Sequence, residues 1–348
     1  MKVAVVLYNL GGPDAPGDVR PFLFNLFNDP MIIDAPGPIR WFLAKLISSR
    51  RAPIAREIYK HIGGRSPLLE NTSAQAEALD TALAATGGND YRTFVAMRYW
   101  HPMASAVARD VKAYAPDKII LLPLYPQFST TTVGSFLRVW QQAVSAIGLD
   151  RPTTSICCYP TEPGFVAAIA AAVRSALEHT NKDAGVRVLF SAHGLPKKIV
   201  AGGDPYQWQV EQTAKAVVDA LGIEGLDWLN CYQSRVGPLE WIDPATEDEI
   251  RRAGAEGLAV VIVPLAFVSE HSETLVELDI EYRRIGDAAG VAGYHRVPTV
   301  SIAEPFIAGL ARLVSVALSG QPSPCSGSGV RFCPDGWPQC PCAAGGTE

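Results

Sequence analysis

The stretch Leu189-Phe190-Ser191-Ala192-His193-Gly194-Leu195-Pro196 ends a run of apolar residues with a histidine and a Gly-Leu-Pro turn. Its first part belongs to Val186–Ser191, which the enrichment in Val, Leu and Phe predicts to be a buried strand. In open α/β sheets ligands bind beyond the carboxyl ends of the strands, so His193 is a candidate for chemistry. A structural role for a lone histidine remains the alternative, and an imidazole can either accept a proton or bind a metal ion.

Short apolar runs alternate with longer Ala-rich stretches of helical period along the chain. This order predicts an α/β fold in which parallel strands are buried by helices on both faces. The expected strands include Val3–Tyr8, Lys118–Leu124, Val186–Ser191 and Leu258–Leu265. The expected helices are Asn71–Ala85, Pro102–Tyr114, Gly164–His179, Tyr206–Leu221, Pro244–Ala253 and Ala303–Leu318.

The two halves of the chain look like duplicates of one arrangement. In each half the first strand ends in a turn, at Gly11-Gly12-Pro13 and at Gly194-Leu195-Pro196, and a later strand ends in a polar loop, at Tyr125–Ser129 and at Val268–His271. Since all four follow the carboxyl ends of expected strands, we expect them to line one cleft.

Charge and hydropathy exclude two classes of protein. The net charge is −5, and no run of Lys or Arg extends beyond short pairs, so nothing resembles a nucleic-acid binder. No apolar run reaches the roughly 18 to 20 residues that a membrane-spanning helix needs. The chain enters a strand at Lys2 without a basic leader or cleavage site, which leads us to expect a cytoplasmic protein.

A long segment of large apolar residues follows the first strand and contains Phe22–Phe27, Met31–Ile33 and Trp41–Leu43, before the basic pair Arg50-Arg51. Helices packed on the sheet are one interpretation, because apolar stripes usually belong to the core. The other is an apolar lip for a flat hydrophobic ligand or for a membrane surface. The basic pair favours the second interpretation, because Arg binds carboxylates well.

Acidic residues are concentrated near one histidine, in the segment Ser269–Tyr282. In a helix, the acids at positions 273, 277 and 281 would form a stripe on one face, and like charges at this spacing repel one another. No Lys or Arg from 270 to 282 offsets them, so a path for cations or protons competes with a solvated face. The candidate residues are Glu270, His271, Glu273, Glu277 and Glu281.

The last two dozen residues contain four of the seven cysteines, in a segment rich in Gly, Pro and Ser with no helical or strand period. In a reducing compartment such a group indicates metal ligation more than disulfides. The spacing from Cys333 to Cys340 and Cys342 lacks the Cys-x2-Cys pairs of zinc ribbons, and Fe–S clusters accept more irregular spacings. Spacing alone leaves zinc and iron–sulfur open.

Seven motifs, in this order, resemble those of the ferrochelatase family. They are Asn9–Pro13, Gly63–Leu68, Met97–Pro102, Tyr125–Ser129, Ser191–Pro196, Gln233–Pro238 and Ser269–Tyr282. The resemblance extends from Val3 to about Leu318 and is far more specific than a single histidine.

This resemblance implies two similar Rossmann-like domains with parallel four-stranded sheets flanked by helices, in the chelatase-like fold, with a porphyrin cleft between them. The expected division is 1–155, including an active-site lip at about 20–55, then 156–318, then a Cys-rich tail at 319–348. The last helix of the second domain would pack back on the first.

The implied activity is insertion of Fe2+ into protoporphyrin IX to form protohaem, the final step of haem biosynthesis, with release of two protons. His193 matches the family's essential histidine and Glu273 its catalytic carboxylate, so that both would meet the ring and the substrate iron, facing each other across the pocket. The division of tasks between them stays open. Glu270, Glu277 and Glu281 match a proton or metal path, and substrate contacts would come from Leu10, Arg51, Tyr59, Ser66, Tyr125, Trp241 and His271.

Some members of the family hold a [2Fe-2S] cluster, and the tail would be its place in this chain. Animal members take one ligand from the position of Thr130, which is no thiolate, so another cysteine must substitute. We expect Cys158, because strand alternation points only one of Cys157 and Cys158 toward a given face. The expected ligands are Cys158, Cys333, Cys340 and Cys342, with Cys325 as the rival for one place.

Three other functions remain open at this point. A coproporphyrin III ferrochelatase would share the fold and the catalytic residues. An iron–sulfur sensor on the same scaffold would have lost the activity, and intact His193 and Glu273 argue against it. A haem-binding protein would bind haem tightly without turnover. A homodimer and peripheral membrane contact are also open.

Overall fold

The computed structural model describes residues 1–348 except 182–183, 236, 238, 321–324, 328–329 and 343–348. One sheet, in the order β2-β1-β3-β4-β9, contains β1 (Lys2–Asn9), β2 (Asp90–Met97), β3 (Lys118–Pro123), β4 (Thr153–Cys158) and β9 (Cys325–Ser326). The other, in the order β6-β5-β7-β8, contains β5 (Val186–His193), β6 (Asp227–Gln233), β7 (Ala259–Pro264) and β8 (Tyr294–Arg296). Neighbouring strands pair in parallel, which confirms the fold class expected from the sequence.

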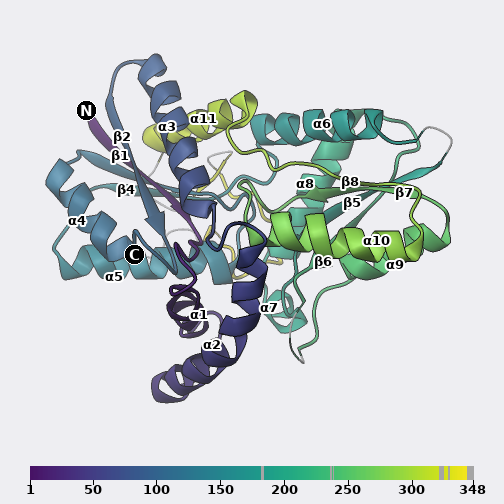
Figure 1. Ribbon diagram of the computed structural model, residues 1–348. Helices are drawn as coiled ribbons and strands as arrows, with labels where there is room; N and C mark the ends of the chain where they lie inside the picture. The colour runs from purple at the N-terminus through teal and green to yellow at the C-terminus, as the bar shows by residue number, and fades with distance from the viewer. Residues whose placement is uncertain (182–183, 236, 238, 321–324, 328–329, 343–348) are drawn as a thin grey trace.

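Helices cover both faces of the two sheets (Figure 1). In the first half they are α1 (Val19–Phe27), α2 (Gly37–Lys60), α3 (Leu68–Thr86), α4 (Ala104–Tyr114) and α5 (Ser135–Ala146). In the second half they are α6 (Pro163–Glu178), α7 (Lys197–Ala201), α8 (Tyr206–Leu221), α9 (Thr246–Ala255), α10 (Tyr282–Ala289) and α11 (Glu304–Ser319). Two π-helices, η1 (Thr130–Gly134) and η2 (Glu273–Glu281), follow β3 and β7. The six helices expected from the sequence coincide with α3, α4, α6, α8, α9 and α11 apart from a few terminal residues.

The tail contributes a short strand that the sequence did not reveal. β9 pairs with β4 through Ile156 and Cys325, and it widens the first sheet from four strands to five. Gly327 N–H also donates to the Cys158 carbonyl at 2.9 Å. Two residues are too few to produce a recognisable period, which is why the pattern of side chains could not predict this strand.

The two halves share one core. Its largest cluster contains Val5 of the first sheet, Phe190 of the second and Phe306 of α11, all fully buried. The end of α11 also contacts the first sheet, because Lys118 Nζ donates to the carbonyl oxygens of Ala317 and Leu318 at 3.2 and 3.0 Å. These contacts agree with a last helix that returns to the first half, while the boundaries at 155 and 318 stay predictions.

Helices α1 and α2 form a hairpin that projects from the first sheet (Figure 1). Asp29, just after α1, anchors the hairpin: its side chain is 1% exposed and accepts hydrogen bonds from Arg98, Tyr99 and Ser135. The Arg98 and Tyr99 bonds are each 2.7 Å long. A carboxylate buried this deeply needs a cationic partner, which Arg98 supplies.

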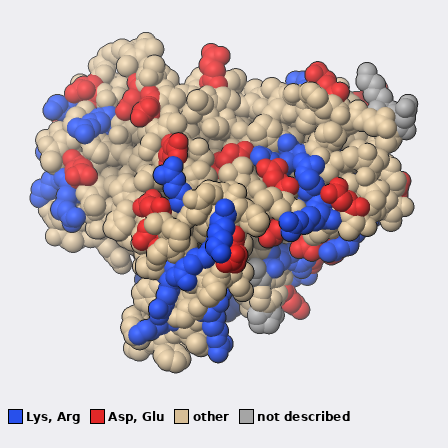
Figure 2. All heavy atoms as spheres, viewed as in Figure 1, with Lys and Arg blue, Asp and Glu red and all other residues tan. Residues whose placement is uncertain are grey.

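The outer side of this hairpin is apolar and basic. Ile39, Trp41, Phe42 and Ile54 are between 48% and 63% exposed, whereas Ala44, Ser48, Ala52 and Tyr59 on the same helix are buried. Figure 2 shows Lys and Arg side chains beside uncharged surface on this projection. The buried side of the hairpin therefore agrees with helices packed on the protein, while a ligand or membrane contact of the exposed side stays a prediction. Among the described residues, no helix is long and apolar enough to cross a membrane.

Candidate active site

His193 and Glu273 are in direct contact at the carboxyl edge of the second sheet. His193 is the last residue of β5, and Glu273 is the first residue of η2, which follows the neighbouring strand β7. The distance from His193 Nδ1 to Glu273 Oε2 is 2.9 Å. We expected the two groups to face each other across the pocket, and this arrangement is wrong. Because β5 and β7 are adjacent parallel strands, both groups leave the sheet at the same edge.

The charge of Glu273 makes His193 a stronger base. Burial lowers the pKa of His193, but the Glu273 carboxylate and its hydrogen bond, with a contribution from Glu277, raise the pKa above its ordinary value. For Glu273, burial raises the pKa, and His193 and His271 outweigh this effect and lower it. The ionised carboxylate therefore accepts the Nδ1 proton of the imidazole and leaves Nε2 free to exchange a proton or bind a metal ion.

His271 lies beside this pair in a different protonation state. Its Nδ1 accepts the backbone N–H of Glu273 at 3.0 Å, which places the proton of a neutral ring on Nε2. Burial lowers the pKa of His271, although the carboxylates of Glu273 and Glu270 act in the opposite direction. His271 is thus a neutral hydrogen-bond donor near neutral pH, whereas His193 is the proton acceptor.

The other two acids of the row, Glu277 and Glu281, lie in different environments. Glu277 accepts hydrogen bonds from Gln233 Nε2, Ser234 N–H and Tyr282 O–H at 3.0, 2.8 and 3.0 Å. Burial first, and then the charge of Glu273, raise its pKa. Glu281, at the end of η2, is exposed. The row therefore extends from the histidine pair to the surface.

Glu270 belongs to a partly buried ion pair with a residue that the sequence analysis missed. Arg296 of β8 contacts Glu270 Oε1 and Asp279 Oδ2, each at 2.6 Å. Burial raises the pKa of Glu270, but Arg296 and three hydrogen bonds lower it below its ordinary value. The compensating cation thus lies outside the segment 270–282, and no local spacing pointed to it.

Gln233 and Ser234, which belong to a recognised motif but had no role assigned, also complete the site. Gln233 Nε2 donates to the Glu273 carbonyl at 3.1 Å as well as to Glu277; Gln233 is the last residue of β6, and Ser234 follows it. Their position at the end of a strand in the same sheet could have predicted that they belong to the site.

Several expected substrate contacts converge on the same region. Tyr59, at the end of α2, hydrogen-bonds Ser272 next to Glu273, and burial raises its pKa to about 12. The Trp241 ring lies close to Gly194, where an added Cβ would be 3.2 Å from the ring, and its buried Nε1 has no partner among the described residues. Gly12 meets Ser66 so closely that a Cβ would lie 2.4 Å from the hydroxyl oxygen.

The remaining expected contacts lie near these. Leu10 follows β1 and packs against the base of the α1–α2 hairpin. Tyr125 follows β3, and its ring lies 6.4 Å from the fully buried ring of Tyr8. Arg51 is on α2, eight residues before Tyr59, and eight residues correspond to about 12 Å of helix.

The thiols of the tail meet the end of β4. Cys157 Sγ is 3.6 Å from Cys158 Sγ and 3.7 Å from Cys342 Sγ. Hydrogen bonds with Cys333 first, and then with Cys342, lower the pKa of the Cys340 thiol. Strand alternation would have separated the sulfurs of Cys157 and Cys158, and that expectation is wrong, because the pairing of β4 with β9 is irregular between Ile156 and Cys158.

Other features of the cysteine site bear on its expected ligands. The side chain of Cys325 lies outside the described residues. The Thr130 N–H and hydroxyl both donate to Asp204 Oδ2 at 2.7 Å. Among the residues that the structure describes, no group of three or more His, Cys, Asp or Glu side chains is placed so that it could hold a metal ion.

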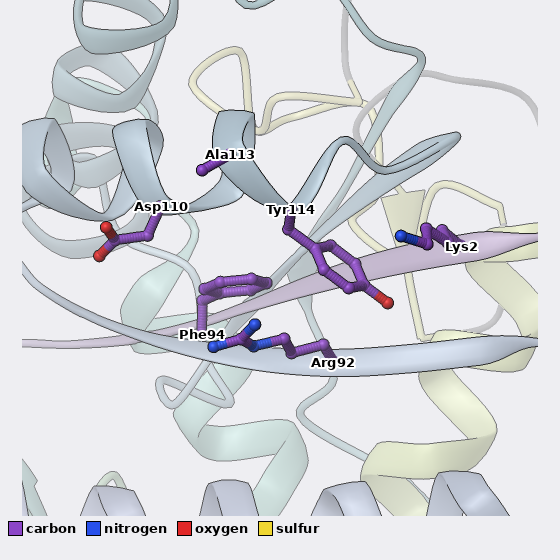
Figure 3. A pocket seen from close by; sticks show the side chains of 6 residues that line it. All are labelled: Lys2, Arg92, Phe94, Asp110, Ala113 and Tyr114. Carbon is purple, nitrogen blue, oxygen red and sulfur yellow. The ribbon is translucent and has the colours of Figure 1, made fainter.

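A hollow of about 460 Å³ lies at the opposite, amino end of the first sheet (Figure 3). Lys2, Arg92 and Tyr114 come together there, with Lys2 Nζ 5.1 Å from the centre of the Tyr114 ring. Since Lys2 begins β1, whereas the site residues follow the other ends of the strands, this hollow is separate from the candidate active site.

Comparison with solved structures places the fold among the chelatases. SirB from Bacillus subtilis with Fe3+ aligns with a TM-score of 0.53 and 11% identity, over 91% of this chain and 96% of that chain. The sirohydrochlorin chelatase SirB from Bacillus subtilis subspecies spizizenii, in complex with cobalt, aligns with the same score over 92% and 96%. The fold is that of a metal chelatase.

Sequence comparison identifies the family. The ferrochelatase family model matches residues 2–318. The ferrochelatase of Caulobacter vibrioides is 52% identical over 347 residues, 99% of each chain, and that of Phenylobacterium zucineum is 52% identical over 348 residues, 100% of each chain. The chain belongs to the ferrochelatase family and is a metal-chelatase enzyme.

The contact between His193 and Glu273 predicts a shift in titration. Glu273→Gln removes the negative charge, so the pKa of His193 should fall, while His295 on β8 should titrate as before. NMR of histidine-labelled protein would measure both. An unchanged His193 titration would contradict the proposed electrostatic coupling. Because the pKa of His193 is raised in the folded state, this interaction stabilises the protein below the ordinary histidine pKa and is lost as pH rises through the raised value.

Proposed function

We propose that the pair His193–Glu273 carries the ferrochelatase reaction of this chain. The reaction inserts Fe2+ into protoporphyrin IX, forms protohaem and releases two protons. Two pyrrole N–H protons must be removed and the ion must lose water, so the site needs a base and metal-binding atoms in one place. The observation that supports this assignment is the 2.9 Å contact between His193 Nδ1 and Glu273 Oε2.

In the proposed mechanism His193 Nε2 accepts a pyrrole proton. Glu273 holds the opposite ring nitrogen through the Nδ1 proton, fixes the orientation of the ring and stabilises the imidazolium that forms. Before Nε2 is protonated, its lone pair can also bind the incoming substrate iron. Glu277 and Glu281 would then pass protons or ions between this pair and the surface.

We propose that Glu270 is not part of the proton or ion path formed by Glu277 and Glu281, but helps to position it. Its ion pair with Arg296 and the backbone N–H of Thr299, at 2.9 Å, already occupy its Oε1. It therefore orients the start of η2, on which Glu273 and Glu277 lie.

The macrocycle would be held by residues around this pair. Tyr59, Ser66 and Tyr125 come from the first half, and Trp241 and His271 from the second, with Leu10 and Arg51 toward the hairpin. Contacts on the periphery of the ring can drive a distortion that exposes the nitrogen lone pairs. The Nε2–H of His271 is available to donate to the ring or to a bound anion.

We also propose that Cys158, Cys333, Cys340 and Cys342 hold a [2Fe-2S] cluster. In donor chemistry the residues fit such a group, because Fe–S clusters bind cysteine thiolates and Cys157 Sγ, next to Cys158 at the end of β4, lies 3.7 Å from Cys342 Sγ of the tail. When bound, the cluster would cross-link the tail to β4 through thiolate–iron bonds. Cys157 becomes a second rival for one place, since its sulfur is adjacent to that of Cys342.

The outer side of the α1–α2 hairpin is proposed to touch an anionic membrane surface. Helix α2 carries Arg40, Lys45, Arg50, Arg51, Arg56 and Lys60, against a single acid, Glu57. Exposed apolar side chains next to basic ones bind both the acyl boundary and the anionic headgroups of a bilayer.

His193→Ala should lower the rate of metallation at least about 100-fold, because it removes the proposed base. The measurement is an anaerobic assay with Fe2+ and protoporphyrin IX. His179→Ala, at the exposed end of α6, is the matched control and should retain activity. Near-normal metallation by the His193 variant would refute the assigned role, provided that circular dichroism shows an unchanged fold.

Cys340→Ser should remove the visible absorption of the cluster and the bound iron and sulfide, because one thiolate ligand is lost. Cys157→Ser serves as the comparison, since its sulfur lies in the same site. A full cluster in the Cys340 variant would exclude this residue as a ligand. Loss of the cluster in the Cys157 variant would show that Cys157 is a ligand in place of one of the four proposed cysteines.

Replacing both Ile39 and Phe42 by Ser should reduce binding to vesicles that contain anionic lipid, because these side chains are 55% and 62% exposed on the hairpin. Sedimentation with vesicles measures the bound fraction. Ile223→Ser is the control, since Ile223 is 42% exposed beyond the end of α8. Equal binding of all three proteins would exclude the hairpin as the membrane contact.

A further inference from the structure

Gln209 of α8 lies between two of the cysteine sulfurs. The residue is fully buried, and its Nε2 is 3.1 Å from Cys333 Sγ and 3.5 Å from Cys158 Sγ. An amide NH2 group has two protons to donate, and here the two nearest acceptors are sulfur atoms from different segments of the chain. Cys158 ends β4, whereas Cys333 belongs to the tail.

The other end of the same amide holds the loop after β3. Gln209 Oε1 accepts the backbone N–H of Phe128 at 2.7 Å, three residues after Tyr125. One helical turn further along α8, Thr213 Oγ1 accepts from Gln127 Nε2 at 2.9 Å. Helix α8 therefore holds this loop at two points, and only the point at Gln209 also reaches the sulfurs.

The segment before α8 contacts the same two partners. Asp204 Oδ2 accepts from the Ser129 hydroxyl at 3.0 Å and from the Thr130 N–H at 2.7 Å. On the other side, Gln339 N–H donates to the Gly203 carbonyl at 3.2 Å. Gly203 has φ +95, and a Cβ there would lie 2.5 Å from the Pro338 ring, so the tail packs against a position that requires glycine.

We propose that Gln209 is a positioning residue that couples the cysteine site to the substrate-binding loop. Its N–H groups stabilise negative charge on the sulfurs of Cys158 and Cys333, while its carbonyl oxygen fixes Phe128 and thereby Tyr125. This inference rests on the proposed cluster. Thiolate sulfur accepts these hydrogen bonds more strongly than neutral thiol does, since charge-assisted bonds are the stronger ones.

A consequence follows for the empty cysteine site. When no cluster fixes Cys158 and Cys333, their sulfurs can move out of reach of the Gln209 amide, and an unsatisfied buried amide is costly. The favourable response is a rotation of the Gln209 side chain, which would release Phe128. Porphyrin binding near Tyr125 then becomes sensitive to the occupancy of the cysteine site.

Gln209→Glu and Thr213→Val separate the two functions of α8. Gln209→Glu keeps an oxygen for Phe128 N–H but replaces the NH2 donor by an oxygen that repels thiolates. Thr213→Val removes the acceptor of Gln127 and leaves the contacts of Gln209 with the two sulfurs in place. The two variants are therefore matched in helix and in burial, because both positions are fully buried.

The experiment measures the midpoint potential of the cluster and the affinity for protoporphyrin IX, by fluorescence, before and after removal of iron with a chelator. Wild-type protein should bind porphyrin several-fold more weakly once iron is removed. Gln209→Glu should lower the potential, since N–H···S bonds favour the reduced state, and should abolish the difference between the two forms. Thr213→Val should weaken porphyrin binding both before and after removal of iron. It should retain the difference in affinity between these two forms and leave the midpoint potential of the cluster unchanged.

The proposal would be overturned if Gln209→Glu left the midpoint potential unchanged and if its porphyrin affinity still fell when iron was removed. Iron and sulfide analysis of the wild-type protein tests the cluster separately. If the wild type contains neither, the cluster proposal fails, and alkylation by iodoacetamide still tests the hydrogen bonds of Gln209. Cys158 and Cys333 should then react more slowly in Gln209→Leu than in wild type, by mass spectrometry, because the loss of the N–H donors reduces the thiolate fraction, and equal rates would exclude the contact.

Discussion

The hydrogen bond between His193 and Glu273 is the interaction around which the site is arranged. It exists because β5 and β7 are neighbours in a parallel sheet, so that the last residue of one strand and the helix after the other meet at one edge. Gln233 from the third adjacent strand, β6, fixes both Glu273 and Glu277. Three strand ends thus determine the orientation of one imidazole, and a change in their spacing would alter the basicity of Nε2.

The acids of the segment 270–281 show how burial separates structural from chemical carboxylates. Glu270 and Asp279 share the guanidinium of Arg296, which compensates their charges. The Glu273 carboxylate is paired with the imidazole of His193, and Glu277 has neutral donors. Charge that is balanced by a fixed cation supports the fold, whereas charge that is balanced by a titratable ring can take part in proton transfer.

The α1–α2 hairpin and the cysteine tail are each held in place by a buried polar side chain that contacts several segments. Asp29 joins the hairpin to Arg98, Tyr99 and Ser135, and Gln209 joins β4, the tail and the loop after β3. Each such group is satisfied only when all its partners are in place, so it specifies one arrangement of the segments that it joins.

The sequence by itself determined the α/β class, the strands β1, β3, β5 and β7, six helices, and His193 and Glu273 as candidates, because these follow from local periodicity and from motifs whose residues are close in the chain. The tertiary structure alone decided that the two residues touch, that Arg296 neutralises Glu270, that Cys157 joins Cys158 beside the tail, and that Gln209 lies between sulfurs. These features depend on residues far apart in the sequence or on an irregular strand end, and no period of side chains along one segment encodes such contacts.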